Sequence, residues 1–499
     1  MTRSSNPDES PEIVIDGTRT KEAFSEKFSS NVPDKEDEAE SIVSANATVI
    51  AVDNQRRLPS KFNSMSNLAS VAEVQNEDGS SNRDDQRASG LRPNRSFAQE
   101  LRQSATSQNH EGQQVAQHGI SDSRIVAQRN ERGPRTNIMA CLTRGIFIVG
   151  AKRTPFGTFG GRLKDVDSIE LGRVAAVAAL EQAKLSPDQV DSVICGNVNQ
   201  ISSKNGPYIA RHVGLRAGVK IQTPCLTINR LCGSGFQSVV TGSQEICLDD
   251  ADIVLALGSE NMSQSPFVQR DCRFGVKFTQ TPTLECSLWT TLTDWNINTP
   301  MGVTAENLAK KYGLSRSEVD EYALMSQTRW KAAHNSGKFK SEIAPIKLME
   351  RRKEVIMEVD EHPKDTTIES LEKLRPSFDK DGVSTAGNSS GIGDGAGAIV
   401  LASEESVSKH KLNPLARVAG YSIVGCDPHI MVAKELKLDM SKTNVNGGAI
   451  ALTHPVGASG SRIIANLVYE MERQKVKHAI GAACIGGGQG IAVLLERLS

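Results

Sequence analysis

Long hydrophobic runs and an excess of charge are both missing from the sequence. No apolar run approaches the ~18 residues that a membrane-spanning helix requires, and the mean hydropathy is −0.34. The 58 Lys and Arg residues nearly balance the 59 Asp and Glu residues, which leaves a formal net charge of −1. Because no apolar run is long enough, we expect no transmembrane segment. Because no excess of basic residues is available to attract phosphates, we expect no nucleic-acid partner.

Paired cysteines are also missing. The nine cysteines are spread from Cys141 to Cys484, their number is odd, and none shows the close spacing of a zinc site. This pattern predicts neither a disulfide framework nor a metal centre. It is typical of a protein in a reducing compartment.

Aromatic residues are scarce, and residues 1–138 contain only four phenylalanines and no Cys, Trp or Tyr. The same segment is rich in Ser, Asn, Asp, Glu, Gln and Arg. Such a composition buries too little apolar surface to offset the entropy of ordering, so we predict a disordered polar extension over residues 1–138. The first ten residues turn acidic and precede no apolar stretch, which predicts neither a secretory signal nor a mitochondrial presequence.

From Met139 onward, short apolar runs alternate with helical patterns. Strands are expected at 146–149, 190–195, 223–229, 253–257 and 491–495, with helices after Asp167, Cys232 and His454. This alternation predicts an α/β fold with a mostly parallel sheet covered by helices. It stops between about 260 and 390, a stretch with all three tryptophans that we interpret as an inserted segment carrying specificity, and it returns from Leu415.

One cysteine lies at a predicted strand-to-helix corner within residues 227–238. Only a thiolate attacks or ligates, and a free cysteine has a pKa of about 8.5. A helix that starts just after Cys232 would turn its unpaired N–H groups toward the sulfur and favour the thiolate. Gly233 and Gly235 allow a tight turn and a close approach of substrate. The alternative is a small, buried and inert cysteine in a glycine-rich turn.

Two further glycine-rich corners carry reactive residue types. His454 lies in a loop, 444–460, that leads into a helical pattern as Cys232 does, so the ordered chain is interpreted as two related halves. Cys484 lies in a third corner, 482–490. Taken singly, the histidine could be structural and the second cysteine could be a packing residue. Together the three residues predict covalent thiol chemistry, with a nucleophile, a base and a second acid/base.

Several stretches together resemble the thiolase family, most closely the mitochondrial 3-ketoacyl-CoA thiolases. They are residues 152–157, 229–238, 258–263, 384–396, 444–460 and 484–490, and the resemblance covers nearly all of 139–499. It implies the thiolase fold, with two βαβαβαββ halves packed as a five-layer αβαβα sandwich. The implied domains are an N-terminal domain over 139–408, with a loop domain at about 260–390, and a C-terminal domain over 409–499.

The resemblance also implies roles for single residues. Cys232 would be the acylated nucleophile, His454 the base that activates it, and Cys484 the acid/base for the acetyl-CoA carbanion. The backbone N–H groups of Cys232 and Gly486 would form one oxyanion hole, and Ser390 would contact the pantetheine of CoA.

The implied activity is CoA-dependent thiolytic cleavage of 3-ketoacyl-CoA in fatty acid β-oxidation, or the reverse Claisen condensation. Coenzyme A and acyl-CoA would be substrates, with no bound cofactor and no metal. The implied assembly is a homodimer or homotetramer, and the implied location is the mitochondrial matrix, with the cytoplasm as the alternative. A ketosynthase shares the nucleophilic cysteine, but it would carry a second histidine where this chain has Cys484.

The sequence departs from the family pattern at two places. Thr453 stands before His454 where the family usually has glycine. After Met431 the family continues with a helix, a strand and an Asn-Glu-Ala-Phe motif before it reaches the equivalent of Val432, so a few dozen residues are absent. That Asn holds a water that forms, with the histidine, the other oxyanion hole. The alternative function is therefore a catalytically impaired thiolase-like protein that binds acyl-CoA or a partner subunit.

Overall fold

The computed structural model describes residues 48–52, 140–141, 144–429 and 438–498. The rest of the predicted extension and the junction after Met431 lie outside the described residues. Strand β1 (Thr48–Val52) falls within the predicted extension, and the strand–helix alternation begins at β3 (Ile146–Arg153).

The first half of the sheet contains five long strands. They are β3, β14 (Gly393–Ser403), β7 (Ile253–Asn261), β5 (Ser192–Gly196) and β6 (Cys225–Ile228), in that spatial order. β14 pairs antiparallel with both β3 and β7, whereas β5 pairs parallel with β7 and β6. The predicted strands 146–149, 190–195, 223–229 and 253–257 are therefore present, but the expectation of a mostly parallel sheet is wrong, because only β5 pairs in parallel and the other pairs of the described sheet are antiparallel. The glycine-rich stretch 384–396 also ends earlier than expected, since β14 already begins at Gly393.

Helices cover both faces of this first half. Alternate residues of β7 face opposite sides: Leu255 and Leu257 pack with α3 (Ser168–Ala183) and α4 (Ile209–Ala217). Val254 and Ala256 pack with α5 (Ser234–Cys247) and α12 (Ser459–Gln474). Every residue of β5, β7 and β14 is buried, as expected for strands covered on both faces.

The start of α3 is capped by a single side chain. The side chain of Asp167 accepts a hydrogen bond from the backbone N–H of Ile169 and caps the helix. Glu170 does not bond back to the cap but pairs with Arg173, one turn later. By contrast, α8 (Arg316–Asn335) begins with a capping box, in which the side chains of Ser315 and Glu318 each accept the backbone N–H of the other residue.

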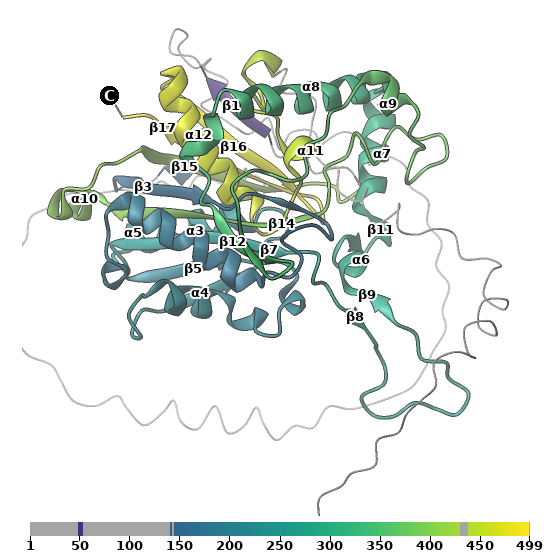
Figure 1. Ribbon diagram of the computed structural model, residues 1–499, viewed down its shortest axis with the longest axis horizontal. Coiled ribbons are helices and arrows are strands. Elements are labelled where there is room, and N and C mark those ends of the chain that lie inside the picture. The colour runs from purple at the N-terminus through teal and green to yellow at the C-terminus, as the bar shows by residue number, and fades with distance from the viewer. Residues whose placement is uncertain (1–47, 53–139, 142–143, 430–437, 499) are drawn as a thin grey trace, which may run out of the picture. The chain divides into compact units, whose positions relative to one another are not determined.

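The second half repeats the first in part. Strands β15 (Ala416–Gly425), β17 (Gln489–Glu496) and β16 (His478–Ile485) pair antiparallel in that order, as β3, β14 and β7 do. β15 joins β3 through two residue pairs, so the strands of both halves form one 11-stranded sheet (Figure 1). Helices α5 and α12 pack between the strands of the two halves.

Beyond β16 the repeat stops. In the first half β5 and β6 follow β7 in parallel, whereas β16 is followed by β1, which pairs with it antiparallel from Thr48↔Ala482 to Val52↔His478. Between β15 and α12 the described residues hold only the 3-10 helix η9 (Met440–Lys442) and the short α11 (Ala449–Leu452). Buried and half-buried residues alternate along β15 and β17, so one face of these strands lacks the cover that β7 and β14 have.

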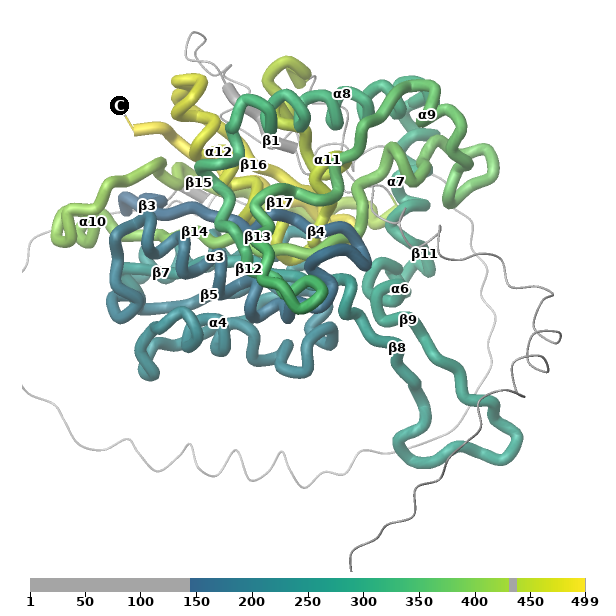
Figure 2. Tube along the Cα trace, viewed as in Figure 1, coloured from purple at the N-terminus to yellow at the C-terminus, as the bar shows by residue number. Residues whose placement is uncertain are grey.

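The inserted segment lies between β7 and β14. Figure 2 traces it in teal and green, with α8 beside α9 (Ile368–Glu372). Its other elements are β8 (Phe267–Val268), β9 (Glu285–Cys286), α6 (Ser287–Thr291), β10 (Thr293–Asp294), β11 (Thr299–Pro300), α7 (Met301–Tyr312), η7 (Lys338–Ser341), β12 (Ile346–Glu350) and β13 (Lys353–Met357).

The remaining elements are short and connect or flank the sheet. They are β2 (Ala140–Cys141), β4 (Gly157–Thr158), η4 (Pro187–Gln189), η5 (Gln200–Ser202), η6 (Gly206–Tyr208) and α10 (Glu404–His410). None of the helices in the described ranges is long and apolar enough to cross a bilayer.

Candidate active site

Helices α5 and α12 touch at their first turns, and glycine makes this contact possible. A Cβ atom on Gly460 would lie 2.1 Å from the backbone nitrogen of Phe236, and one on Gly235 would lie 2.7 Å from that of Ser461. Real Cβ atoms do not approach other atoms so closely, so both positions exclude a side chain. The corners that precede the two helices, which carry Cys232 and His454, are thereby brought together.

The Cys232 corner has a strained backbone. Leu231 has a φ of 45°, a left-handed conformation that is uncommon outside glycine. The hydroxyl of Ser234 holds this turn, because it accepts the backbone N–H of Arg230 at 2.9 Å and donates to the carbonyl of Leu231 at 2.7 Å. The next residue, Cys232, lines a pocket.

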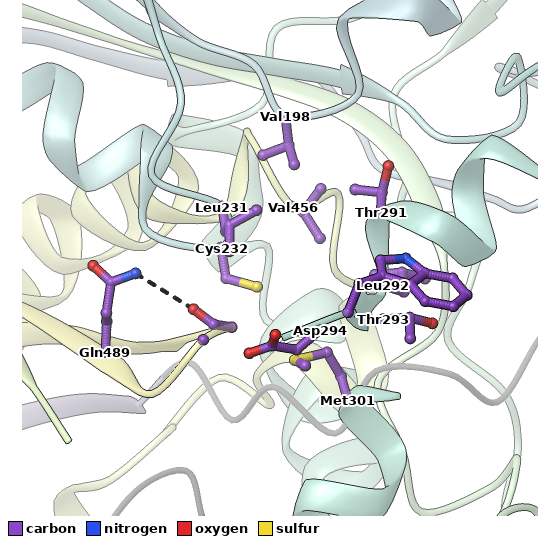
Figure 3. A pocket seen from close by; sticks show the side chains of 13 residues that line it. Val198, Leu231, Cys232, Thr291, Leu292, Thr293, Asp294, Met301, Val456 and Gln489 are labelled. Atoms are coloured by element: carbon purple, nitrogen blue, oxygen red, sulfur yellow. Dashed lines mark hydrogen bonds between the residues drawn. The ribbon is translucent and has the colours of Figure 1, made fainter. Parts of the chain in front are cut away.

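The pocket next to Cys232 has a volume of about 290 Å³. Figure 3 shows the cysteine sulfur pointing into the space that the lining residues surround. The inserted segment supplies one wall, which includes Asp294 and Met301, and the second half of the chain supplies Val456 and Gly486. The full lining is Val198, Leu231, Cys232, Thr291, Leu292, Thr293, Asp294, Trp295, Met301, Val456, Gly486, Gly487 and Gln489.

The Cys232 thiol is only 5% exposed, and this burial raises its pKa to about 11. Hydrogen bonds from the backbone N–H groups of Gly486 and of Cys232 itself act in the opposite direction, whereas the negative charge of Glu260 adds to the rise. The sequence led us to expect a lowered pKa, and that expectation is wrong for this state because loss of hydration outweighs the backbone dipoles. The thiol therefore needs a base.

His454 is fully buried and has the properties of such a base. Burial and the nearby charge of Arg462 lower its pKa to about 3, so the imidazole is neutral at physiological pH. Its Nδ1 lies 2.5 Å from the hydroxyl oxygen of Ser459, and its backbone N–H donates to the carbonyl of Gly391. Among the described residues, its Nε2 has no hydrogen-bond partner.

Thr453, which stands where the family usually has glycine, has a φ of 75° and a ψ of 173°. Only glycine adopts this backbone region without strain. The threonine hydroxyl donates to the carbonyl of Gly391 at 2.5 Å, and a Cβ on the neighbouring Gly393 would lie 2.5 Å from that hydroxyl. The substitution therefore crowds the turn that carries His454.

Cys484 is near the end of β16, opposite Gly490 of β17, and is 4% exposed. It belongs to the same buried cluster as Cys232, together with Val456 and Met301. The structure thus brings both predicted cysteines to one place, although Cys484 is not among the residues that line the pocket.

Ser390 also lies outside the pocket lining, and it is 1% exposed. Its hydroxyl oxygen has no hydrogen-bond partner among the described residues. The next residue, Gly391, offers the carbonyl that holds both Thr453 and His454, so Ser390 is adjacent in sequence to the support of the His454 corner.

Sequence reasoning assigned no role to Glu260, which the structure places beneath both corners. This fully buried carboxylate accepts the backbone N–H groups of Val198 at 2.9 Å, Asn199 at 3.1 Å and Gly457 at 3.1 Å. Burial raises its pKa to about 7. A glutamate three residues after the apolar run 253–257 was the available signal, because a charged residue at the end of a buried strand needs specific partners.

Comparisons with known proteins agree with this arrangement. The family model "Thiolase, N-terminal domain" matches residues 146–405, and "Thiolase, C-terminal domain" matches 428–497. The chain belongs to the thiolase family. It is 52% identical to human mitochondrial 3-ketoacyl-CoA thiolase, over 71% of this chain and 99% of the relative. It is 37% identical to an acetyl-CoA acetyltransferase of Syntrophomonas wolfei, over 72% and 100%.

Solved structures give the same family. The crystal structure of human mitochondrial 3-ketoacyl-CoA thiolase in complex with CoA superposes with a TM-score of 0.70, at 52% identity, over 72% of this chain and 99% of that one. The predicted thiolase fold is confirmed. The alignment with the human sequence is 393 positions long, whereas 71% of 499 residues is about 354, so about 40 of its positions have no residue here. Their location after Met431 stays a prediction.

Proposed function

We propose that this thiolase is an acetyl-CoA C-acyltransferase that cleaves 3-ketoacyl-CoA with coenzyme A, in β-oxidation, to acetyl-CoA and a shortened acyl-CoA. The same chemistry in reverse is a Claisen condensation. The observation that carries the proposal is the buried Cys232 thiol, which points into a pocket with the N–H of Gly486 at its sulfur. The 52% identity to human mitochondrial 3-ketoacyl-CoA thiolase supports this substrate class.

In the first half of the proposed reaction, Nε2 of His454 takes the proton of the Cys232 thiol. The thiolate attacks the 3-keto carbon, and the backbone N–H groups of Cys232 and Gly486 stabilise the resulting oxyanion. The bond between C2 and C3 of the substrate then breaks, and its electron pair leaves on the acetyl-CoA carbanion. Cys484 gives that carbanion a proton, so acetyl-CoA departs and an acyl group stays on Cys232.

In the second half, the Cys484 thiolate takes the proton of the incoming CoA thiol. The CoA sulfur attacks the acyl thioester, the bond to Cys232 breaks, and His454 returns its proton to the Cys232 sulfur. Ser390, whose buried hydroxyl lacks a partner among the described residues, contacts the pantetheine of CoA in this proposal. CoA and acyl-CoA enter this proposed reaction as substrates, and it uses no bound cofactor.

The second candidate function is a thiolase-like protein that binds acyl-CoA but turns over poorly. It is favoured by the second half of the fold, which in the described residues has no parallel strands beyond β16. Loss of the Asn and water of one oxyanion hole would slow the reaction by about 10² to 10³.

We also propose that the protein is located in the mitochondrial matrix, since several relatives at 51–52% identity are named as mitochondrial enzymes. The proposed assembly is a homodimer or homotetramer, which the resemblance to the family implies. The division into domains at 139–408 and 409–499 remains a prediction.

Intact-mass analysis after incubation with acetyl-CoA tests the nucleophile. We expect one acetyl adduct on the full chain, retained in Cys272→Ser, a control in the inserted segment, and lost in Cys232→Ser. An adduct that persists in Cys232→Ser contradicts the assignment. A thiolysis assay with 3-ketoacyl-CoA then separates the two candidate functions, because the impaired protein would form the adduct without releasing product at a useful rate.

A further inference from the structure

One serine contacts the proposed base directly. Ser459 is the first residue of α12, and both Ser459 and His454 are fully buried. The hydroxyl oxygen of Ser459 lies 2.5 Å from Nδ1 of His454 and 3.1 Å from the carbonyl oxygen of Pro455. On the other side of the imidazole, Nε2 has no partner among the described residues.

The hydrogen-bond partners around His454 favour one of its two neutral tautomers. A neutral imidazole carries one N–H, and a serine hydroxyl has one proton to donate. If the imidazole proton were on Nε2, this buried N–H donor would have no acceptor among the described residues, which is an unfavourable arrangement. If it is on Nδ1, it donates to the Ser459 oxygen, and the Ser459 proton is donated to the Pro455 carbonyl. Only the second arrangement satisfies every donor.

We propose that Ser459 is a positioning residue that holds His454 in the Nδ1–H tautomer, so that the lone pair on Nε2 is available to take the proton of Cys232. The inference rests on the proposed function, because it specifies which nitrogen performs the base step. In that step the S–H bond of Cys232 breaks and an N–H bond forms at Nε2. The imidazolium then keeps its Nδ1–H bond to the Ser459 oxygen.

The position of Ser459 is fixed by its own backbone. Its N–H also donates to the Pro455 carbonyl, and the neighbouring Gly460 is in contact with α5 at a distance that excludes any side chain. Two residues earlier, Gly457 donates its N–H to Glu260. The backbone of Ser459 therefore cannot follow His454 if the ring turns, so the bond from its hydroxyl favours one ring orientation as well as one tautomer.

The first test reads the tautomer in the free protein by 15N NMR of the histidine-labelled full chain, with His454→Gln to assign the signals. We expect Nδ1 of His454 to be protonated and Nε2 to be unprotonated at pH 7. A protonated Nε2 in the wild-type chain overturns the proposal. Because no substrate is present, a chain with the expected tautomer but no thiolysis contradicts the proposed function and leaves the Ser459 assignment supported.

The second test combines the same spectrum with kinetics. In Ser459→Ala we expect signal for the Nε2–H tautomer, and a kcat for thiolysis lower by about 10- to 100-fold with little change in KM, since the base is present but no longer oriented. Ser459→Thr retains the hydroxyl and should restore both readouts. Ser243→Ala removes an equally buried hydroxyl of α5, which bonds to the carbonyl of Val239, and should change neither. If Ser459→Ala leaves both the tautomer and kcat unchanged, the proposal is contradicted.

Discussion

Among single residues, Thr453 is in the most strained backbone conformation near the proposed base. Replacing it by glycine removes a strain of about 1–3 kcal/mol but also one hydrogen bond, worth about 1 kcal/mol. We therefore expect Thr453→Gly to raise the free energy of unfolding by about 1 kcal/mol, measured by urea denaturation. Lys475→Gly, at an ordinary left-handed helix end with a φ of 54°, should give a smaller gain. A lower urea midpoint for Thr453→Gly would show that its hydroxyl matters more than its backbone.

The raised pKa of Cys232 predicts how alkylation depends on pH. Its pKa of about 11 lies above the pKa of about 8.5 of a free cysteine, so little thiolate is present at pH 7 in the resting protein. The rate of Cys232 alkylation by iodoacetamide should therefore keep rising from pH 7 to pH 10. Peptide mass spectrometry can follow this position separately from the half-buried Cys272. A rate that levels off below pH 8 would mean that the sulfur is already ionised.

Glu260 predicts a pH dependence of stability. Its folded pKa of about 7 is above the ordinary value of 4.5, so the folded state binds the proton more tightly than the unfolded state. The stability that this adds is fully present below pH 4.5 and is lost as pH rises through 7, at about 1.4 kcal/mol per unit of pKa difference. The side chain of Glu260→Gln cannot titrate. As the pH rises from 5 to 7.5, the unfolding free energy of the wild type should therefore fall relative to that of the variant.

Urea denaturation of both chains at the two pH values measures this difference. Ser243→Ala, which removes a buried hydroxyl that does not titrate in this range, should show a constant difference from wild type between pH 5 and 7.5. A constant difference for Glu260→Gln as well would place the pKa of Glu260 outside this window.

At the scale of elements, the contact between α5 and α12 determines whether the two corners meet. Gly460→Ala would place a Cβ 2.1 Å from the backbone of Phe236, and backbone cannot move aside as a flexible side chain can. We expect a loss of about 1–3 kcal/mol in unfolding free energy and a lower rate of thiolysis. Gly425→Ala, where the nearest atom is 4.0 Å away, is the matched control. Equal stability of the two variants would mean that the helices separate without cost.

Periodicity was sufficient to predict most elements of the fold, because buried strands and amphipathic helices leave regular patterns. The strand at 253–257 and the helix after Cys232 are examples, and both are present as β7 and α5. The three reactive corners were predicted from glycine and residue type. The raised pKa of Cys232 and the role of Glu260 were not predictable in this way, since each depends on burial by segments distant in sequence. Likewise, the pairing of β1 with β16 has no local signal, because the strands are more than 400 residues apart in the chain.

For the whole molecule, the decisive feature is the outer edge of β16, the strand that carries Cys484. On its outer side the corresponding strand of the first half, β7, is continued by two parallel strands. The outer edge of β16 is paired only with the five residues of β1 in the part of the chain that the structure describes, while its other edge pairs with β17. An unpaired strand edge exposes N–H and C=O groups that pair readily with other chains. With the family segment missing after Met431, as the sequence predicts, the stability of the second half should therefore depend on β1.

A two-by-two comparison tests this dependence. One change removes residues 1–138, and the other inserts after Met431 the corresponding segment of human mitochondrial 3-ketoacyl-CoA thiolase. In the unmodified chain, we expect truncation to cause aggregation and a lower melting temperature, because it leaves the outer edge of β16 unpaired. In the restored chain, we expect the strand of the inserted segment to pair with β16 and the helix of that segment to cover apolar surface, which contributes ~25 cal/mol per Å². Truncation should then have little effect on stability, and thiolysis should be faster. Light scattering and thermal unfolding of the four chains measure the coupling. If truncation lowers stability equally with and without the inserted segment, β1 and that segment do not share the edge of β16, and the two changes act independently.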